Sequence, residues 1–157
     1  MKLRVYVETS VVSYLTARPS LDALHMARQS YSQQLWLSQN RYQLFVSDLV
    51  LDEAGEGDAV AAEKRLSALQ GLDMLVVPDA AVDLAESLIR LEAMPAKAYA
   101  DALHIACASM ERMDLIASWN FRHIASIWAR QKIRDALIQL GFAAPIIATP
   151  EDLMESH

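Results

Sequence analysis

The stretch LRVYVETS, residues 3–10, contains the pattern that decides the fold. Residues 3–7 are mostly apolar, with β-branched and aromatic members, which is typical of a short buried strand. Residues 8–10 then break the apolar run with groups that commonly open a helix. This stretch therefore predicts a strand that passes directly into a helix.

The same alternation continues along the whole chain. Spacing and capping residues predict helices over residues 10–17, 21–40, 48–54, 58–70, 80–92, 96–113 and 120–140, with a break of undefined position in the last one. Short apolar runs predict strands over residues 3–7, 43–47, 74–77, 115–118 and 145–148, and TPED at residues 149–152 opens a final helix. Strands separated by helices predict an α/β fold, a parallel sheet with helices on both faces.

Length and composition fit one soluble domain. With 157 residues and 54% hydrophobic residues, the chain is long enough for one core, and we expect a single domain over residues 1–157. The single cysteine, Cys107, excludes an intramolecular disulfide and a cysteine-based zinc site. The sequence has neither an apolar run of about 18 residues nor the apolar core of a signal peptide, so we expect a cytoplasmic protein without a membrane segment.

The charge balance limits how the chain could bind nucleic acid. A net charge of −6 counts against affinity that rests on broad neutralisation of phosphates. It does not exclude a nuclease, because Arg122, Arg130, Lys132 and Arg134 could guide a substrate locally. The segment 130–134 is more typical of a solvated helix face than of a phosphate contact.

Two polar side chains are expected at one edge of the sheet. Glu8 directly follows the first predicted strand, and Asn120 follows the fourth after one residue. The functional crevice of such sheets lies beyond the carboxyl ends of the strands.

Glu53 shares a helical face with Leu49 and Val50, whereas Asp52 points about 100° away, so Glu53 is the inward acid.

Asp101 is the third candidate acid. It lies in line with Ile105 and Ala108 on an otherwise apolar helix face, where an unpaired carboxylate would be costly, so the position calls for a partner. A cation is one possible partner, and an ion pair with Lys97, four residues earlier, is the other. Asp114 is left out because it precedes the fourth strand, about 13 Å from the other end.

Several of these residues also have a purely structural interpretation. A single acid at a strand end is usually a helix N-cap, and the joint pattern is stronger than any one member. Ser10 could cap the first helix or hydrogen-bond a water or phosphate oxygen. His104 is expected to be packed and hydrogen-bonded, because hard metals prefer oxygen ligands. Core packing is likewise preferred to base stacking for Trp119, Phe121 and His123.

Four segments in this order resemble the PIN-domain proteins, specifically the VapC-like toxins of bacterial toxin-antitoxin pairs. They are VYVETS (residues 5–10), VSDLVLDE (46–53), DALHIA (101–106) and LIASWNF (115–121). The resemblance implies a parallel sheet with flanking helices, an acidic cluster that binds Mg²⁺ or Mn²⁺, and ribonuclease activity on single strands. It also implies a homodimer and a cognate antitoxin that holds the enzyme inactive.

Carried over by position, the resemblance makes Glu8, Glu53, Asp101 and Asn120 the four catalytic residues. Glu8, Glu53 and Asp101 would hold the metal, while Asn120 and Ser10 would orient water or substrate. Two positions depart from the family pattern, because Glu8 and Asn120 stand where aspartate is usual. Asn120 offers an amide but no charge, so the cluster has at most three negative charges.

Three functions remain open at this point. The first is a metal-dependent endoribonuclease that acts as a toxin on an RNA substrate. The second is a degenerate PIN fold that binds RNA or a protein without cleaving, and the third is a phosphohydrolase for small phosphate esters.

Overall fold

A computed structural model describes residues 1–155 and contains one five-stranded sheet in the order β3-β2-β1-β4-β5. Every pair of neighbouring strands is parallel. The strands are β1 (Leu3–Val7), β2 (Tyr42–Ser47), β3 (Asp73–Leu75), β4 (Leu115–Ala117) and β5 (Ile146–Ala148). This confirms the predicted α/β class and the parallel sheet.

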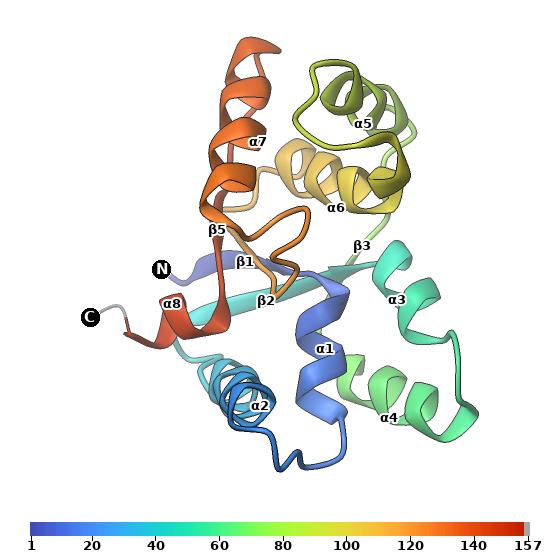
Figure 1. Cartoon of the computed structure of the whole chain (residues 1–157), viewed down its shortest axis with the longest axis vertical. Helices are drawn as coiled ribbons and strands as arrows, with labels where there is room; N and C mark the ends of the chain where they lie inside the picture. The colour runs from blue at the N-terminus through green and yellow to red at the C-terminus, as the bar shows by residue number, and fades with distance from the viewer. Residues whose placement is uncertain (156–157) are drawn as a thin grey trace.

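Helices cover both faces of the sheet, as predicted (Figure 1). One side carries α1 (Thr9–Thr16), α2 (Ala23–Trp36), α4 (Ala59–Leu69) and α8 (Pro150–Glu155), and the other carries α5 (Ala81–Arg90), α6 (Tyr99–Met110) and α7 (Ile127–Gln139). The short α3 (Asp48–Ala54) follows β2, and a turn of 3-10 helix, η1 (Ala96–Ala98), leads into α6. Among the described residues no helix is long and apolar enough to cross a membrane.

The strand order creates a switch point between β1 and β4. From β1 the chain moves outward through β2 and β3, and then returns to the other side of β1 with β4 and β5. Val7 pairs with Ala117, so the residues that follow these strands, Glu8 and Ser118, lie next to each other. Such switch points are where open α/β sheets bind ligands.

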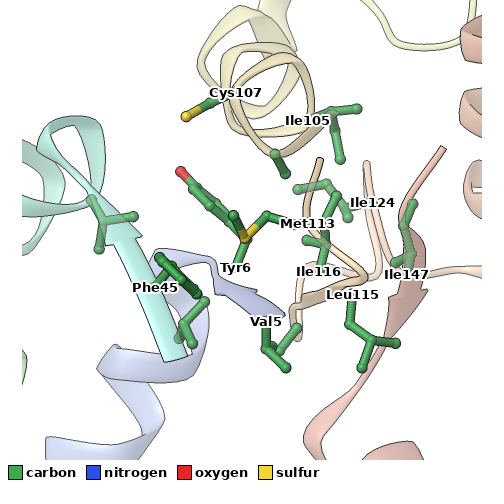
Figure 2. Close-up of a cluster of buried hydrophobic side chains, with 14 of the residues drawn as sticks. Val5, Tyr6, Phe45, Ile105, Cys107, Met113, Leu115, Ile116, Ile124 and Ile147 are labelled. Atoms are coloured by element: carbon green, nitrogen blue, oxygen red, sulfur yellow. The ribbon is translucent and has the colours of Figure 1, made fainter. Parts of the chain in front are cut away.

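The central strand is buried on both faces, as expected for a parallel sheet covered by two helical layers. Val5, Tyr6 and Val7 of β1 have no exposed surface. Figure 2 shows the Tyr6 ring rising from β1 toward α6, which carries Ile105 and Cys107. The side chain of Tyr6 thus crosses from the sheet to the helix layer.

The helix predicted to start at Asn120 is wrong for residues 120–126. The Asn120 Oδ1 accepts the His123 amide at 3.0 Å, and this side-chain bond stabilises a turn in place of a helix. The helix α7 begins only at Ile127, after Ser126, whose Oγ accepts the Ala129 amide. The predicted helix over residues 21–40 is shorter, and its buried residues include Ser32 and Leu35 while Leu24 is exposed.

Candidate metal centre

Glu8 lies at the end of β1 and connects three segments. Its carboxylate Oε2 accepts the Ser10 amide at 3.1 Å, so Glu8 itself is the N-cap of α1. Its Oε1 accepts the hydroxyls of Ser10 at 2.5 Å and Ser118 at 2.6 Å. The extra methylene of glutamate lets the carboxylate reach across to the residue after β4. Only 5% of Glu8 is exposed, so its orientation is fixed by these bonds.

The N-cap interpretation of Ser10 is therefore wrong. The hydroxyl of Ser10 donates to Glu8, and the same oxygen accepts the Trp119 amide at 2.8 Å. Ser10 thus joins α1 to the loop after β4. Its predicted role toward water or substrate stays a prediction.

Glu53 approaches the cluster from α3, which begins after the N-cap Ser47. Its Oε1 accepts the Thr9 hydroxyl at 2.6 Å and lies 2.6 Å from the His104 Nε2. Burial alone would raise the pKa of Glu53, but the bonds from His104 and Thr9 outweigh burial and place the pKa below its ordinary value. The neighbouring Asp52 is exposed, which confirms Glu53 as the inward acid.

His104 belongs to a chain of buried hydrogen bonds that supports Glu53. It is 0% exposed, and its Nδ1 lies 2.6 Å from the Tyr6 hydroxyl, which lies 2.8 Å from the Ser47 Oγ. Because the pKa of Glu53 is lowered, its carboxylate is ionised at neutral pH and His104 must donate from Nε2. This confirms the expectation of a packed, hydrogen-bonded histidine.

Asp101 and Asn120 form the other side of the cluster. The first turn of α6 places Asp101 half-buried, and burial together with the charge of Glu8 raises its pKa. The Asn120 side chain hydrogen-bonds Asp101 and moderates this rise. Since the Asn120 Oδ1 already accepts the His123 amide, its Nδ2 is the donor to Asp101.

The structure thus brings Glu8, Glu53, Asp101, Asn120 and Ser10 to one edge of the sheet. Ligand atoms of Glu8, Glu53 and His104 lie within 4.8 Å of one another. Asp101 is close enough to the cluster for the charge of Glu8 to raise its pKa. No ion pair joins Lys97 to Asp101 in residues 1–155, so the surface-pair explanation of Asp101 does not hold. Asp114 accepts the Arg4 amide at the opposite end of the strands.

The oxygen atoms of the cluster fit a hard divalent cation. An ionised carboxylate offers about four lone-pair sites. Glu8 uses three and Glu53 uses two, both on Oε1, so each retains acceptor capacity. His104 does not fit as a ligand, because the nitrogen that faces the cluster carries the hydrogen bonded to Glu53. The set suited to a metal is therefore all oxygen, as Mg²⁺ and Mn²⁺ prefer.

Sequence reasoning missed three supporting residues. Ser118 donates to Glu8, Thr9 donates to Glu53, and Tyr6 holds the far nitrogen of His104. Ser118 and Thr9 stand beside chosen residues in the sequence, and hydroxyls next to acids at strand ends are a usable signal. Tyr6 and His104 are 98 positions apart, so nothing local in the sequence pairs them.

The aromatic residues after β4 have different environments. Trp119 is 5% exposed and its Nε1 donates to Ser32, which confirms core packing for that side chain. Phe121 is 41% exposed, so the predicted core packing is wrong for this residue, and the Arg28 guanidinium lies 5.1 Å from its ring centroid.

Two solved structures share this architecture. A chain of the crystal structure of VapBC2 from Rickettsia felis, bound to a DNA fragment from its promoter, superposes with a TM-score of 0.59 at 13% identity, covering 94% of this chain and 98% of that one. The toxin VapC20 from Mycobacterium tuberculosis, which cleaves the sarcin-ricin loop, gives a TM-score of 0.50 at 20% identity, covering 71% and 86%. No protein-family model and no curated protein matches the sequence.

At these identities the comparison establishes the fold. The chain has the fold of these VapC structures, a parallel sheet whose switch point here gathers acidic side chains.

Proposed function

We propose that this chain is a metal-dependent endoribonuclease and the toxin of a toxin-antitoxin pair. The observation that carries the proposal is the convergence of Glu8, Glu53 and Asp101 at the switch point of a VapC-like fold. Crowded carboxylates repel one another unless a cation lies between them. The pKa of Asp101 is raised first by burial and then by the nearby charge of Glu8.

In this proposal Glu8, Glu53 and Asp101 hold Mg²⁺ or Mn²⁺. When bound, such an ion polarises a phosphodiester and makes water a stronger nucleophile. The chain's own groups then act by position. Thr9 and His104 bond one oxygen of Glu53 and leave the other available to a metal. Asn120 orients Asp101 through its amide, so we assign Asn120 a positioning role in place of the predicted contact with water.

The test is cleavage of a mixed single-stranded RNA pool with Mn²⁺, with Mg²⁺ and with chelator. We expect cutting only with metal, and a loss of at least about 100-fold in Asp101→Asn, since even outer partners of metal ligands cost 10–100-fold. Asp52→Asn is the matched control, because it also removes one carboxylate, but from an exposed position next to Glu53 that faces away from the cluster. Cleavage retained in Asp101→Asn would place the chemistry elsewhere.

A folded wild type that cuts nothing with either metal would favour a fold that binds without cleaving. The observation behind this alternative is Asn120, which supplies no fourth negative charge. Asn120→Asp then distinguishes a weak site from a site that has lost its function, because the added carboxylate should strengthen Mn²⁺ binding measured by calorimetry. A preference for mononucleotides over RNA would instead favour a phosphohydrolase for small esters.

We also propose a cognate antitoxin as partner, a homodimer and a cytoplasmic location. The likeness to the VapBC2 structure supports the partner. Support for the dimer comes from exposed apolar side chains at the start of α2, where Leu21, Leu24 and Met26 are 98%, 56% and 50% exposed. A monomeric mass in light scattering at micromolar concentration, unchanged in Leu24→Ser, would contradict the dimer and this surface.

A further inference from the structure

A groove of about 600 Å³ lies between the segment that leads into α6 and the start of α7. One wall contains Met94 and Pro95, and the other contains Arg122, Trp128 and Lys132. Figure 1 shows α5 and α7 next to each other on the same side of the sheet.

His123 connects the groove to the acidic cluster. It lines the groove, and its backbone amide donates to the Asn120 Oδ1 at 3.0 Å. Asn120 in turn hydrogen-bonds Asp101 of the acidic cluster. A single-stranded nucleic acid that extends from the acidic cluster past His123 would therefore reach the groove.

The charge of the groove opposes that of the chain. Arg122 and Lys132 are exposed, and no carboxylate pairs with either one within the described part of the chain. Glu92 is the one acid among the groove residues, whereas the whole chain has a net charge of −6. A polyanion directed to the acidic cluster would find compensating cations here.

The groove also offers a flat apolar surface. Trp128, on the first turn of α7, is 71% exposed, in contrast to the buried Trp119. An exposed indole beside two unpaired cations suits an unpaired base with its flanking phosphates.

We propose that this groove binds the single-stranded RNA segment that adjoins the cleaved phosphodiester, with one base stacked on Trp128 and phosphates near Arg122 and Lys132. This inference rests on the proposed function, because it takes RNA as the substrate. A peptide segment of a partner protein is the competing occupant. RNA is favoured because His123 joins the groove to Asn120 of the acidic cluster, and because the groove presents cations beside its exposed aromatic face.

The first experiment compares two substrates of the wild type in Mn²⁺, a dinucleotide and an oligonucleotide of about 12 nucleotides, within the usual span of single-strand sites. For the longer substrate we expect kcat/KM to fall about tenfold in Trp128→Leu and to stay near wild type in Trp128→Phe, which keeps an aromatic face. The dinucleotide, too short to fill the groove, should be cleaved equally by all three proteins. Equal loss on both substrates, or on neither, would overturn the proposal.

The second experiment measures binding of the same oligonucleotide in chelator by fluorescence anisotropy, so it does not depend on cleavage. The double variant Arg122→Ala, Lys132→Ala should make the slope of log affinity against log salt less steep by about 1.4. This is the contribution expected from two phosphate contacts on a single strand. Lys64→Ala, an exposed lysine on α4, is the control and should leave the slope unchanged.

These measurements separate the two proposals. A wild type that cleaves no RNA but binds it through Trp128, Arg122 and Lys132 would refute the nuclease and keep the groove. Cleavage with unchanged affinity and salt slope in all groove variants would refute the groove alone. RNA binding unchanged in Trp128→Leu, together with lost binding of a purified partner protein, would assign the groove to that protein.

Discussion

Glu53 and Asp101 lie in the same acidic cluster but differ in how the fold holds them. Glu53 receives bonds from Thr9 and from the buried His104, and its pKa is lowered. Asp101 receives one bond, from Asn120, and burial with the nearby charge of Glu8 raises its pKa. The fold thus stabilises the negative charge on Glu53 and destabilises the negative charge on Asp101.

This difference indicates which part of the site is organised in advance. The Ser47–Tyr6–His104–Glu53 chain joins β2, β1, α6 and α3, so it depends on the assembled core. The charge on Asp101 has no comparable support within the described residues. In the proposed metal site, Glu53 is therefore positioned before the cation binds, whereas the charge of Asp101 is compensated only once the cation is bound.

The largest effect should follow from His104→Leu. This change removes one buried partner from each of two groups, so the Tyr6 hydroxyl keeps only Ser47 and the Glu53 carboxylate keeps only Thr9. We expect the free energy of unfolding to fall by roughly 2–4 kcal/mol, since each unsatisfied buried group costs about 1–3 kcal/mol. The melting temperature should fall by roughly 5–15 °C.

His104→Gln separates loss of the bond from loss of packing, because its amide can still donate to Glu53. It should recover part of the stability and most of the Mn²⁺ affinity, measured by calorimetry. Glu63→Leu, at an exposed position of α4, is the surface control and should change stability by less than about 0.5 kcal/mol. Equal Mn²⁺ affinity in the leucine and glutamine variants would show that His104 does not position Glu53.

Tyr6→Phe removes the next bond of the same chain and should have a smaller effect. The buried hydroxyl lies between His104 and Ser47, and its loss should cost about 1–2 kcal/mol in urea unfolding. Tyr31→Phe also removes a hydroxyl, but one that bonds Glu155 at the surface, and it should be nearly neutral. Comparable losses in the two variants would argue against a special role of the buried chain.

The two sides of the cluster also differ in how far sequence alone predicts them. Helical spacing was sufficient to orient Glu53 inward and Asp52 outward, because both lie on one regular element. The position of Asn120 at the strand end was predicted, but the turn after it was missed, since a side-chain bond to the His123 amide competes there with helix. The support from Tyr6 and His104 depends on packing α6 over β1, which no local pattern specifies.

Acid titration should show opposite signs for the two carboxylates. The folded-state pKa of Glu53 is lowered, so its stabilising contribution is present above its ordinary value of 4.5 and is lost as pH falls through the folded pKa. In chelator, Glu53→Gln should therefore be less stable than wild type at pH 7, by the linkage between pKa and stability. The difference should vanish in strong acid, and a difference independent of pH would contradict this assignment.

In chelator, Asp101→Asn should have the smallest effect on the free energy of unfolding, and it should stabilise the protein where Glu53→Gln destabilises it. A raised folded-state pKa means that the ionised form destabilises the fold, so this cost is present at neutral pH and disappears as pH falls toward the ordinary value of 3.8. Without metal the variant should melt roughly 1–3 °C above wild type, for a gain of up to about 1 kcal/mol.

Mn²⁺ should reverse that order. At a free concentration of about 100 times Kd the wild type gains roughly 2.7 kcal/mol, while a variant that has lost the site gains little. The curves of melting temperature against Mn²⁺ should therefore cross, with Asp101→Asn more stable at low metal and wild type more stable at high metal. Parallel curves would mean that Asp101 does not bind the metal. The charge of Asp101 becomes stabilising only when this carboxylate holds a cation.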